Sequence, residues 1–153
     1  MKYIEKYPKI IDELVKKSFP ELKGKKIFIY EFNSKKFIGG AWSFLFFRTL
    51  WINRRLRKRR DILMGIITHE LCHLEIDCKR GYFKSFITGL SYFFNNSVRK
   101  SEEKKAVILS IEKGFAKVNF KTAKFKEKNF KNNLKYYLSS EEIKKYAKSI
   151  AKW

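Results

Sequence analysis

The residues best suited to chemistry are His69, Glu70 and His73, which form the pattern HExxH within residues 61–80. Apolar residues recur at helical spacing through this stretch, which predicts a helix. Side chains four residues apart share one helix face, so the two imidazoles can hold one metal ion, with zinc the typical choice. Glu70 is placed to reach a water on such an ion rather than the ion itself. The spacing therefore predicts a hydrolytic metal site.

A catalytic zinc ion usually takes three protein ligands and leaves one position for water. The third ligand here is not histidine, because the chain contains 2 His and both are in the motif. Asp77 shares their helix face but lies about 6 Å further along the axis than His73, and Glu75 points to a different side. We interpret Cys72 and Cys78 as inert helix thiols. A carboxylate on a second helix is the better candidate.

The motif HELCHLE at 69–75 is followed by EKKA at 103–106 and IEKGF at 111–115. With these motifs, residues 26–115 resemble the gluzincin metallopeptidases. The likeness is closest to the small catalytic domains of membrane-associated heat-shock proteases and CAAX prenyl endopeptidases, and to the minigluzincins. It implies a zinc metalloendopeptidase in which His69, His73 and Glu103 bind Zn²⁺ and Glu70 is the general base. Glu102 is the alternative third ligand.

The resemblance carries further expectations and two departures. An extended peptide or protein substrate would pair with an edge strand within residues 37–48. Residues 1–116 would form the catalytic domain, and residues 117–153 a helical extension of the same compact unit that could cover the cleft and hold the enzyme latent. Val107 stands where such relatives have an aspartate that supports the zinc-binding histidines. The histidine that the minigluzincins use as third ligand is absent.

The elements that must position these residues follow from periodicity and turn signals. Glycines 81 and 114 should end helices, and Ser139 and Glu142 have capping-box spacing. The predicted fold is α+β, with a three- or four-stranded mixed sheet over the HExxH helix. We expect helices at 3–19, 61–80, 82–94 and 101–112 and two more after 117, and strands at 26–32, 37–47 and 49–54.

The amino-acid composition limits which functions and partners the protein can have. The chain has 153 residues, and 36 Lys+Arg against 15 Asp+Glu leave a net charge of +21. This length fits one domain, and the charge favours polyanionic partners, although dispersed lysines also fit a solvated surface. The alternative function is a basic protein that binds nucleic acid or an anionic surface, with a structural or degenerate metal site. The aromatic helix at 82–94 could pack in the core or rest on an anionic membrane.

Three features that the sequence lacks predict the cellular location of the protein. Two cysteines are too few for a disulfide scaffold. The N-terminal residues have no uninterrupted apolar segment typical of a secretory leader. The apolar runs at 37–47 and 85–97 are too short or too polar to span a bilayer. We therefore expect a cytoplasmic protein with at most peripheral membrane contact.

Overall fold

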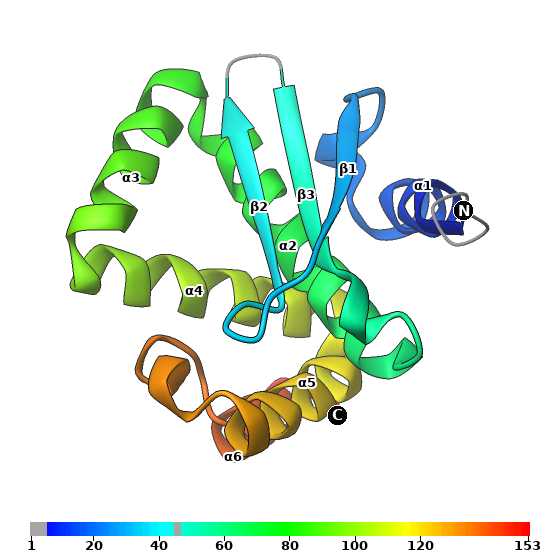
Figure 1. The fold of residues 1–153 in the computed structure, drawn as a ribbon, viewed down its shortest axis with the longest axis vertical. Helices are drawn as coiled ribbons and strands as arrows, with labels where there is room; N and C mark the ends of the chain where they lie inside the picture. Colours follow the sequence, from blue (N-terminus) through cyan, green and yellow to red (C-terminus); the bar gives the residue numbers. More distant parts are fainter. Residues whose placement is uncertain (1–5, 45–46) are drawn as a thin grey trace.

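The computed structural model describes residues 6–44 and 47–153, and within them the protein is mostly helical with one small mixed sheet, an α+β architecture (Figure 1). The strands are β1 (Ile27–Phe32), β2 (Gly39–Phe44) and β3 (Phe47–Asn53). The helices are α1 (Lys6–Ser18), α2 (Arg60–Arg80), α3 (Tyr82–Phe94), α4 (Asn96–Ser110), α5 (Ala116–Asn129) and α6 (Ser140–Ser149).

The sheet has the strand order β1-β3-β2, with β1 parallel and β2 antiparallel to the central β3. Because side chains alternate along a strand, Leu50 and Ile52 of β3 face inward while Trp51 between them is exposed. Of the two edge strands, β2 lies within the segment predicted to hold the substrate-binding edge.

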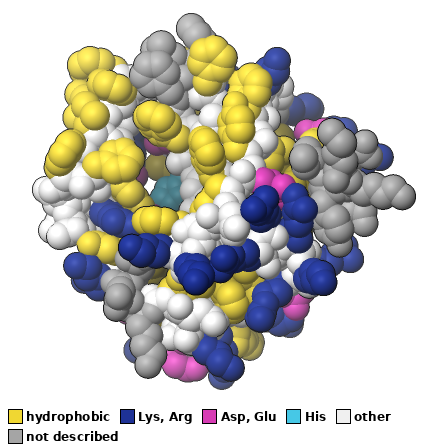
Figure 2. Space-filling model, viewed as in Figure 1, with side chains coloured by type: hydrophobic (Ala, Val, Ile, Leu, Met, Phe, Trp, Pro, Cys, Tyr) yellow, Lys and Arg dark blue, Asp and Glu magenta, His cyan; other side chains and the backbone are white. Residues whose placement is uncertain are grey.

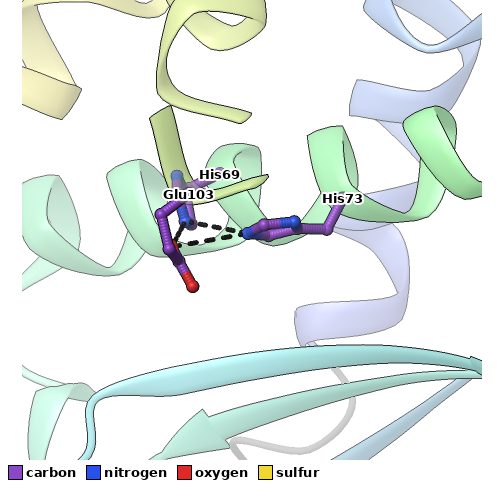
Figure 3. Close-up of side chains that lie close together, drawn as sticks. All are labelled: His69, His73 and Glu103. Atoms are coloured by element: carbon purple, nitrogen blue, oxygen red, sulfur yellow. Dashed lines mark hydrogen bonds and ion pairs between the residues drawn. The ribbon is translucent and has the colours of Figure 1, made fainter. Parts of the chain in front are cut away.

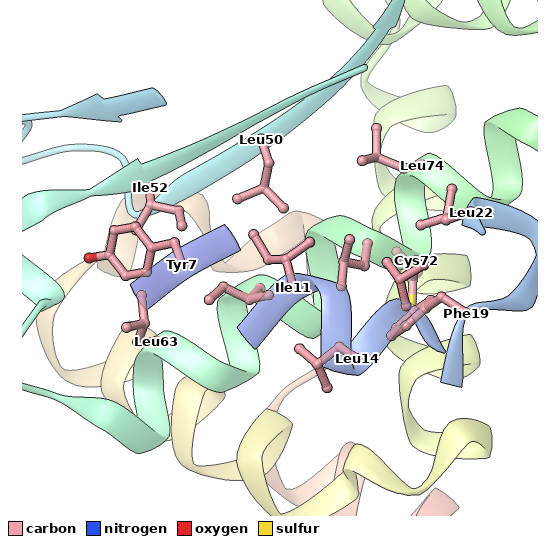
Figure 4. Close-up of a cluster of buried hydrophobic side chains, with 14 residues drawn as sticks. Tyr7, Ile11, Leu14, Phe19, Leu22, Leu50, Ile52, Leu63, Cys72 and Leu74 are labelled. Atoms are coloured by element: carbon pink, nitrogen blue, oxygen red, sulfur yellow. The ribbon is translucent and has the colours of Figure 1, made fainter. Parts of the chain in front are cut away.

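The main core fills the space between the sheet, α1 and α2 (Figure 4). The core residues come from α1, α2 and the sheet, because each of the two helices turns an apolar face toward the strands. They include Tyr7, Ile11, Leu14, Leu50, Ile52, Leu63, Cys72 and Leu74. A second cluster joins α4, α5 and α6. The HExxH helix α2 thus lies between the sheet and the C-terminal helices, as a largely buried element.

Helix ends follow the predicted signals closely. Gly81 ends α2 with a positive φ of 84°, and α3 occupies the predicted range 82–94. The capping box at Ser139 and Glu142 is formed at the start of α6. The predicted helix 3–19 is observed from Lys6, since residues 3–5 lie outside the described part of the chain.

Three element boundaries were predicted wrongly. The second strand is shorter than residues 37–47, and the third begins at Phe47 rather than at residue 49. The helix predicted for 101–112 begins at Asn96, because the Asn95 side chain caps it by accepting hydrogen bonds from two backbone N–H groups. The glycine signal at Gly114 is confirmed, because its φ of 90° is non-helical and separates the helical turns after α4 from α5.

Candidate metal centre

Helix α2 positions the three residues of the HExxH motif. His69 and Glu70 are buried, with relative exposures of 5% and 8%. One turn further on, His73 is partly buried, and its ring lies edge-on to that of His69 at a centroid distance of 4.8 Å. The two imidazoles therefore stack along one face of the helix, as their spacing predicts.

Glu103 of α4 completes a three-residue cluster with the two histidines (Figure 3). Its Oε2 lies 3.0 Å from His69 Nε2 and 3.5 Å from His73 Nε2. The two histidine Nε2 atoms are 3.2 Å apart. In Figure 3 the three side chains, from two helices, point toward one another. Residues 34 positions apart in the chain thus converge on one point.

The triangle of ligand atoms fits a zinc ion. Zinc–ligand distances of about 2.0–2.1 Å at tetrahedral angles put neighbouring ligand atoms about 3.3 Å apart. The three separations in the cluster, 3.0, 3.2 and 3.5 Å, lie around that value. Two imidazoles and one carboxylate are also a donor set typical of catalytic zinc. The residues present therefore match the predicted metal in both geometry and chemistry.

Burial and mutual charge shift the pKa values of the cluster. Burial lowers the pKa of His69 to about 4. Burial also acts to lower the pKa of His73, but its hydrogen bond and charge attraction to Glu103 outweigh this and raise it to about 9. Burial would raise the pKa of Glu103, yet the two histidines hold it well below its usual range. The cluster is thus built around an ionised carboxylate that favours a cation.

Glu70 is set beside this cluster, against strand β2. An ideal Cβ on Gly39 would lie 3.3 Å from the Glu70 Oε1 and only 2.5 Å from Ile66 Cγ2, so glycine allows β2 to approach α2 this closely. Burial raises the pKa of Glu70 to about 7, and the negative charge of Glu103 adds to the rise. A carboxyl group with this pKa can both accept and release a proton near neutral pH.

Tyr92 orients the Glu103 carboxylate and was not identified from the sequence. Its hydroxyl donates a hydrogen bond to Oε1 of Glu103, which leaves Oε2 to face the histidines. The Arg99 guanidinium lies 5.3 Å from the centroid of the Tyr92 ring. The sequence holds no signal for this contact, because it crosses from α3 to α4 and depends on how the two helices meet.

The C-terminal part of the chain lies over Glu70. Two small cavities, of about 20 and 40 Å³, reach the Glu70 side chain, and Lys126 and Tyr137 line both. The Lys126 ammonium sits 3.5 Å from the Tyr137 ring centroid, and the ring of His69 lies 6.1 Å from the same tyrosine. Burial lowers the pKa of Lys126, although Glu103 and Glu70 attract its charge. Neither residue was identified from the sequence as part of the site.

The other carboxylates considered as ligands have other partners. Glu102 forms ion pairs with Arg80 at 2.5 Å and Lys105 at 2.9 Å. Glu75 is buried on the far side of α2, where Lys79 and Lys113 each lie 2.8 Å away. Asp77 is 3.7 Å from Arg80 and does not join the cluster found among the described residues.

The two cysteines of α2 are also outside the cluster. Cys72 is fully buried in the main core, and burial raises the pKa of its thiol. Cys78 accepts a hydrogen bond from Arg48 Nε at 3.2 Å. The buried environment of Cys72 agrees with the interpretation that its thiol is inert, whereas for Cys78, partly exposed beside a guanidinium, that interpretation stays a prediction.

Val107 of α4 is buried in the cluster of α4, α5 and α6 and lines the cavity beside His69. A valine offers no hydrogen-bond acceptor. Among the hydrogen bonds of residues 6–44 and 47–153, none involves the Nδ1 atom of either histidine. The orientation of both rings therefore depends on their packing and on Glu103.

Two wider observations complete the description. In the described ranges, no helix combines the length and the apolar character needed to cross a bilayer. Comparison with known proteins finds no matching family model, no matching curated protein and no matching solved structure.

Proposed function

We propose that this protein is a zinc-dependent metalloendopeptidase. The observation that carries the proposal is the triangle formed by His69 Nε2, His73 Nε2 and Glu103 Oε2, with edges of 3.0 to 3.5 Å. The buried Glu70 stands beside it on the same helix. A structural metal site has no need of a protonatable carboxyl group as a fourth residue beside its three ligands, whereas a water-activating site uses one as general base.

The residues divide the chemistry between them. His69, His73 and Glu103 would hold the ion, and Tyr92 would keep the Glu103 carboxylate turned toward it. A bound zinc ion would lower the pKa of a coordinated water and polarise the scissile carbonyl. Glu70 would accept the proton of the attacking water and deliver it to the leaving amine nitrogen as the C–N bond breaks. Burial raises the pKa of this carboxyl, which favours the uptake of a proton by Glu70 in the first of these steps.

The edge strand β2 offers a place for the substrate backbone. Among the described strands, β2 pairs only with β3, so its other edge is available to an extended peptide. Gly39 brings the same strand against Glu70. A peptide added at this edge would pass close to the group proposed as general base.

The C-terminal segment would restrict access to this edge. Lys126 and Tyr137 line both of the small cavities beside Glu70. Tyr136 anchors the segment to α4, because its hydroxyl donates to Asn96 Oδ1 at 2.6 Å and its ring lies 4.4 Å from the Arg99 guanidinium. We infer that the protein is latent until this segment moves.

Metal analysis by mass spectrometry tests the proposed site. We expect about one zinc ion per chain in the wild type. Glu103→Gln should lose the metal because it removes a ligand carboxylate. Glu102→Gln, the adjacent residue on the same helix, is the matched control and should keep it. Zinc retained in Glu103→Gln and lost in Glu102→Gln would contradict the ligand assignment.

Hydrolysis of denatured casein tests the reaction, since an unfolded protein offers extended segments. The assay uses the zinc-loaded Tyr136→Ala variant, in which the C-terminal segment has lost its anchor. Adding Glu70→Gln should abolish cleavage while zinc content stays the same. Cleavage that persists without the Glu70 carboxylate, or no cleavage by either zinc-loaded protein, would overturn the proposal.

A further inference from the structure

Helix α3 turns its large apolar side chains away from the protein. Ser85 is the one buried residue of this helix. The α3 apolar stripe, as we name it, consists of Phe83, Phe86, Ile87, Leu90, Phe93 and Phe94, with exposures from 45% to 88%. These residues recur every three or four positions and so form one continuous face. Core packing, one of the two expectations for this segment, is therefore wrong.

Polar contacts hold α3 to the rest of the molecule instead. Ser85 Oγ donates to the backbone oxygen of Asp77 at 3.0 Å, and Tyr92 donates to Glu103. An ordinary surface helix turns its polar side to solvent. In α3 the polar side faces the rest of the protein instead. Exposed apolar surface of this extent is typical of a site that meets a membrane or another protein.

The α3 apolar stripe belongs to a wider hydrophobic surface. Tyr30, Trp42 and Trp51 are also exposed, at 40% to 55%, on the outer face of the sheet. Figure 2 shows hydrophobic side chains gathered over α3 and over the strands, with a histidine in the hollow between them. The metal centre thus opens on the same side of the molecule as the stripe.

Charge indicates the nature of the partner. Residues 81–101 contain no Asp or Glu, but include Lys84 on α3 and Arg99 and Lys100 on α4. Two copies of a chain with a net charge of +21 repel each other, which disfavours the stripe as a contact between copies. An anionic bilayer instead offers an apolar interior and negative headgroups together.

A cavity at the start of α3 provides a second observation. Its volume is about 640 Å³, and Phe83 and Phe86 of the stripe line it together with Arg48. Arg48 is only 5% exposed, and no ion pair joins it to a carboxylate of the described residues. Asp77, the acidic residue in the cavity wall, lies beside Arg80 instead. Arg48 donates to the Cys78 thiol at 3.2 Å but to no carboxylate of the described residues. A buried guanidinium of this kind, in a cavity lined by aromatic and polar side chains, fits the phosphate of a lipid headgroup.

We propose that the α3 apolar stripe docks this protein on an anionic phospholipid bilayer, with a lipid headgroup at Arg48. The aromatic side chains of the stripe enter the boundary between headgroups and acyl chains, and the surrounding lysines and arginines meet the negative lipid surface. This surface serves the protein whether or not the metal centre hydrolyses peptides.

Vesicle co-sedimentation of the full chain tests this proposal. The probes are vesicles of phosphatidylcholine alone and of phosphatidylcholine with phosphatidylserine. We expect binding to the anionic vesicles, weaker binding to the neutral ones, and partial release by salt. A combined Phe83→Ser, Phe93→Ser and Phe94→Ser variant should bind at least about tenfold more weakly. Trp153→Ser, which removes an exposed aromatic elsewhere, should bind as the wild type does.

Charge variants separate the headgroup contact from the apolar contact. Arg48→Met and, on the exposed surface, Lys84→Glu should each reduce the preference for anionic vesicles without abolishing binding. Equal binding of the wild type and the triple variant would overturn the proposal, as would equal binding to both vesicle types. A dimer that the triple variant dissociates, without vesicle binding, would assign the stripe to a second copy and also overturn it.

Discussion

Glu102 and Glu103 are neighbours in the sequence, yet helix α4 directs their carboxylates to different partners. Glu103 meets the two histidines, whereas Glu102 pairs with Arg80 and Lys105. Consecutive residues on a helix are rotated by about 100° about its axis, so they cannot share one target. This separation of roles favours Glu103 over Glu102 as the proposed third ligand.

Tyr92 offers a test of how the cluster is supported. Tyr92→Phe removes the hydroxyl that orients Glu103 but keeps the ring. We expect metal affinity to fall about 10- to 100-fold, as for other groups that orient a metal ligand. Competition with a chromogenic chelator measures the affinity. Tyr146→Phe, which removes a hydroxyl bonded to Glu112 away from the cluster, is the control. Equal metal affinities of the two variants would show that the Tyr92 hydroxyl does not support metal binding.

The ion pairs of Glu102 predict how stability depends on pH. Burial raises the pKa of Glu102, but Lys105 and Arg80 outweigh it and leave the pKa lower than usual. A carboxyl with a lowered folded-state pKa stabilises the fold above its unfolded pKa, about 4.3. That contribution is lost as pH falls through the folded-state pKa.

Glu102→Gln should therefore cost about 1.5–3 kcal/mol of unfolding free energy at pH 7. The difference from the wild type should shrink as the pH falls below about 4. Urea unfolding at several pH values measures both quantities. A difference that stays constant with pH would mean that the lost stability is not electrostatic.

At the scale of elements, we expect alanine substitutions at two helix glycines to change the stability of the protein in opposite directions. In α2, an ideal Cβ on Gly65 would lie 2.2 Å from Thr122 Oγ1 and 2.6 Å from the Val118 oxygen of α5. In α3, nothing lies within 4 Å of the corresponding position on Gly89. The first glycine allows two helices to touch, whereas the second has no such packing role.

Gly65→Ala should thus destabilise the protein by about 1–3 kcal/mol, because α5 must move away from α2. Gly89→Ala should stabilise it by up to about 1 kcal/mol, because alanine favours the helix and meets no obstacle. Chemical denaturation of both variants provides the comparison. A neutral Gly65→Ala would show that α5 packs less tightly on α2 than described.

Elements were predictable from the sequence where the signals are local. Helix α3 and the end of α2 depend on Gly81, and the start of α6 depends on its own capping box. The order of the strands was not predictable, because the parallel pairing of β1 with β3 joins segments that β2 separates in the chain. The sequence left open whether the apolar face of α3 is buried or exposed. Periodicity identifies an apolar face but not what covers it.

For the candidate site, the sequence placed His69, Glu70 and His73 on one helix, since that relation is local. Glu103 came from the family resemblance, and the structure brings it to the histidines. Tyr92, Lys126 and Tyr137 follow only from the packing of distant helices. Whether the cluster binds zinc stays a prediction.

At the scale of the whole molecule, the C-terminal segment connects access to the site with the packing of α5. A truncation after residue 117 would remove α5, which packs on α2 and buries Ala123. Tyr136→Ala is a smaller change, because it releases the segment from α4 and leaves α5 in place.

If the protein is a latent peptidase, Tyr136→Ala should cleave denatured casein faster than the wild type at equal zinc content. Tyr136→Phe, which keeps the ring against Arg99 but loses the bond to Asn96, should lie between them. Cleavage rates at matched zinc loading decide the point. Equal rates in all three proteins would mean that the segment does not limit access.

Both imidazoles of the chain lie in the one cluster, since the sequence holds 2 His. A nuclear magnetic resonance spectrum of the protein with isotope-labelled histidine would therefore contain signals from this centre alone. Tautomer, protonation and metal contact of each ring could be followed without a single substitution. The scarcity of histidine turns the two rings into built-in reporters of the site they form.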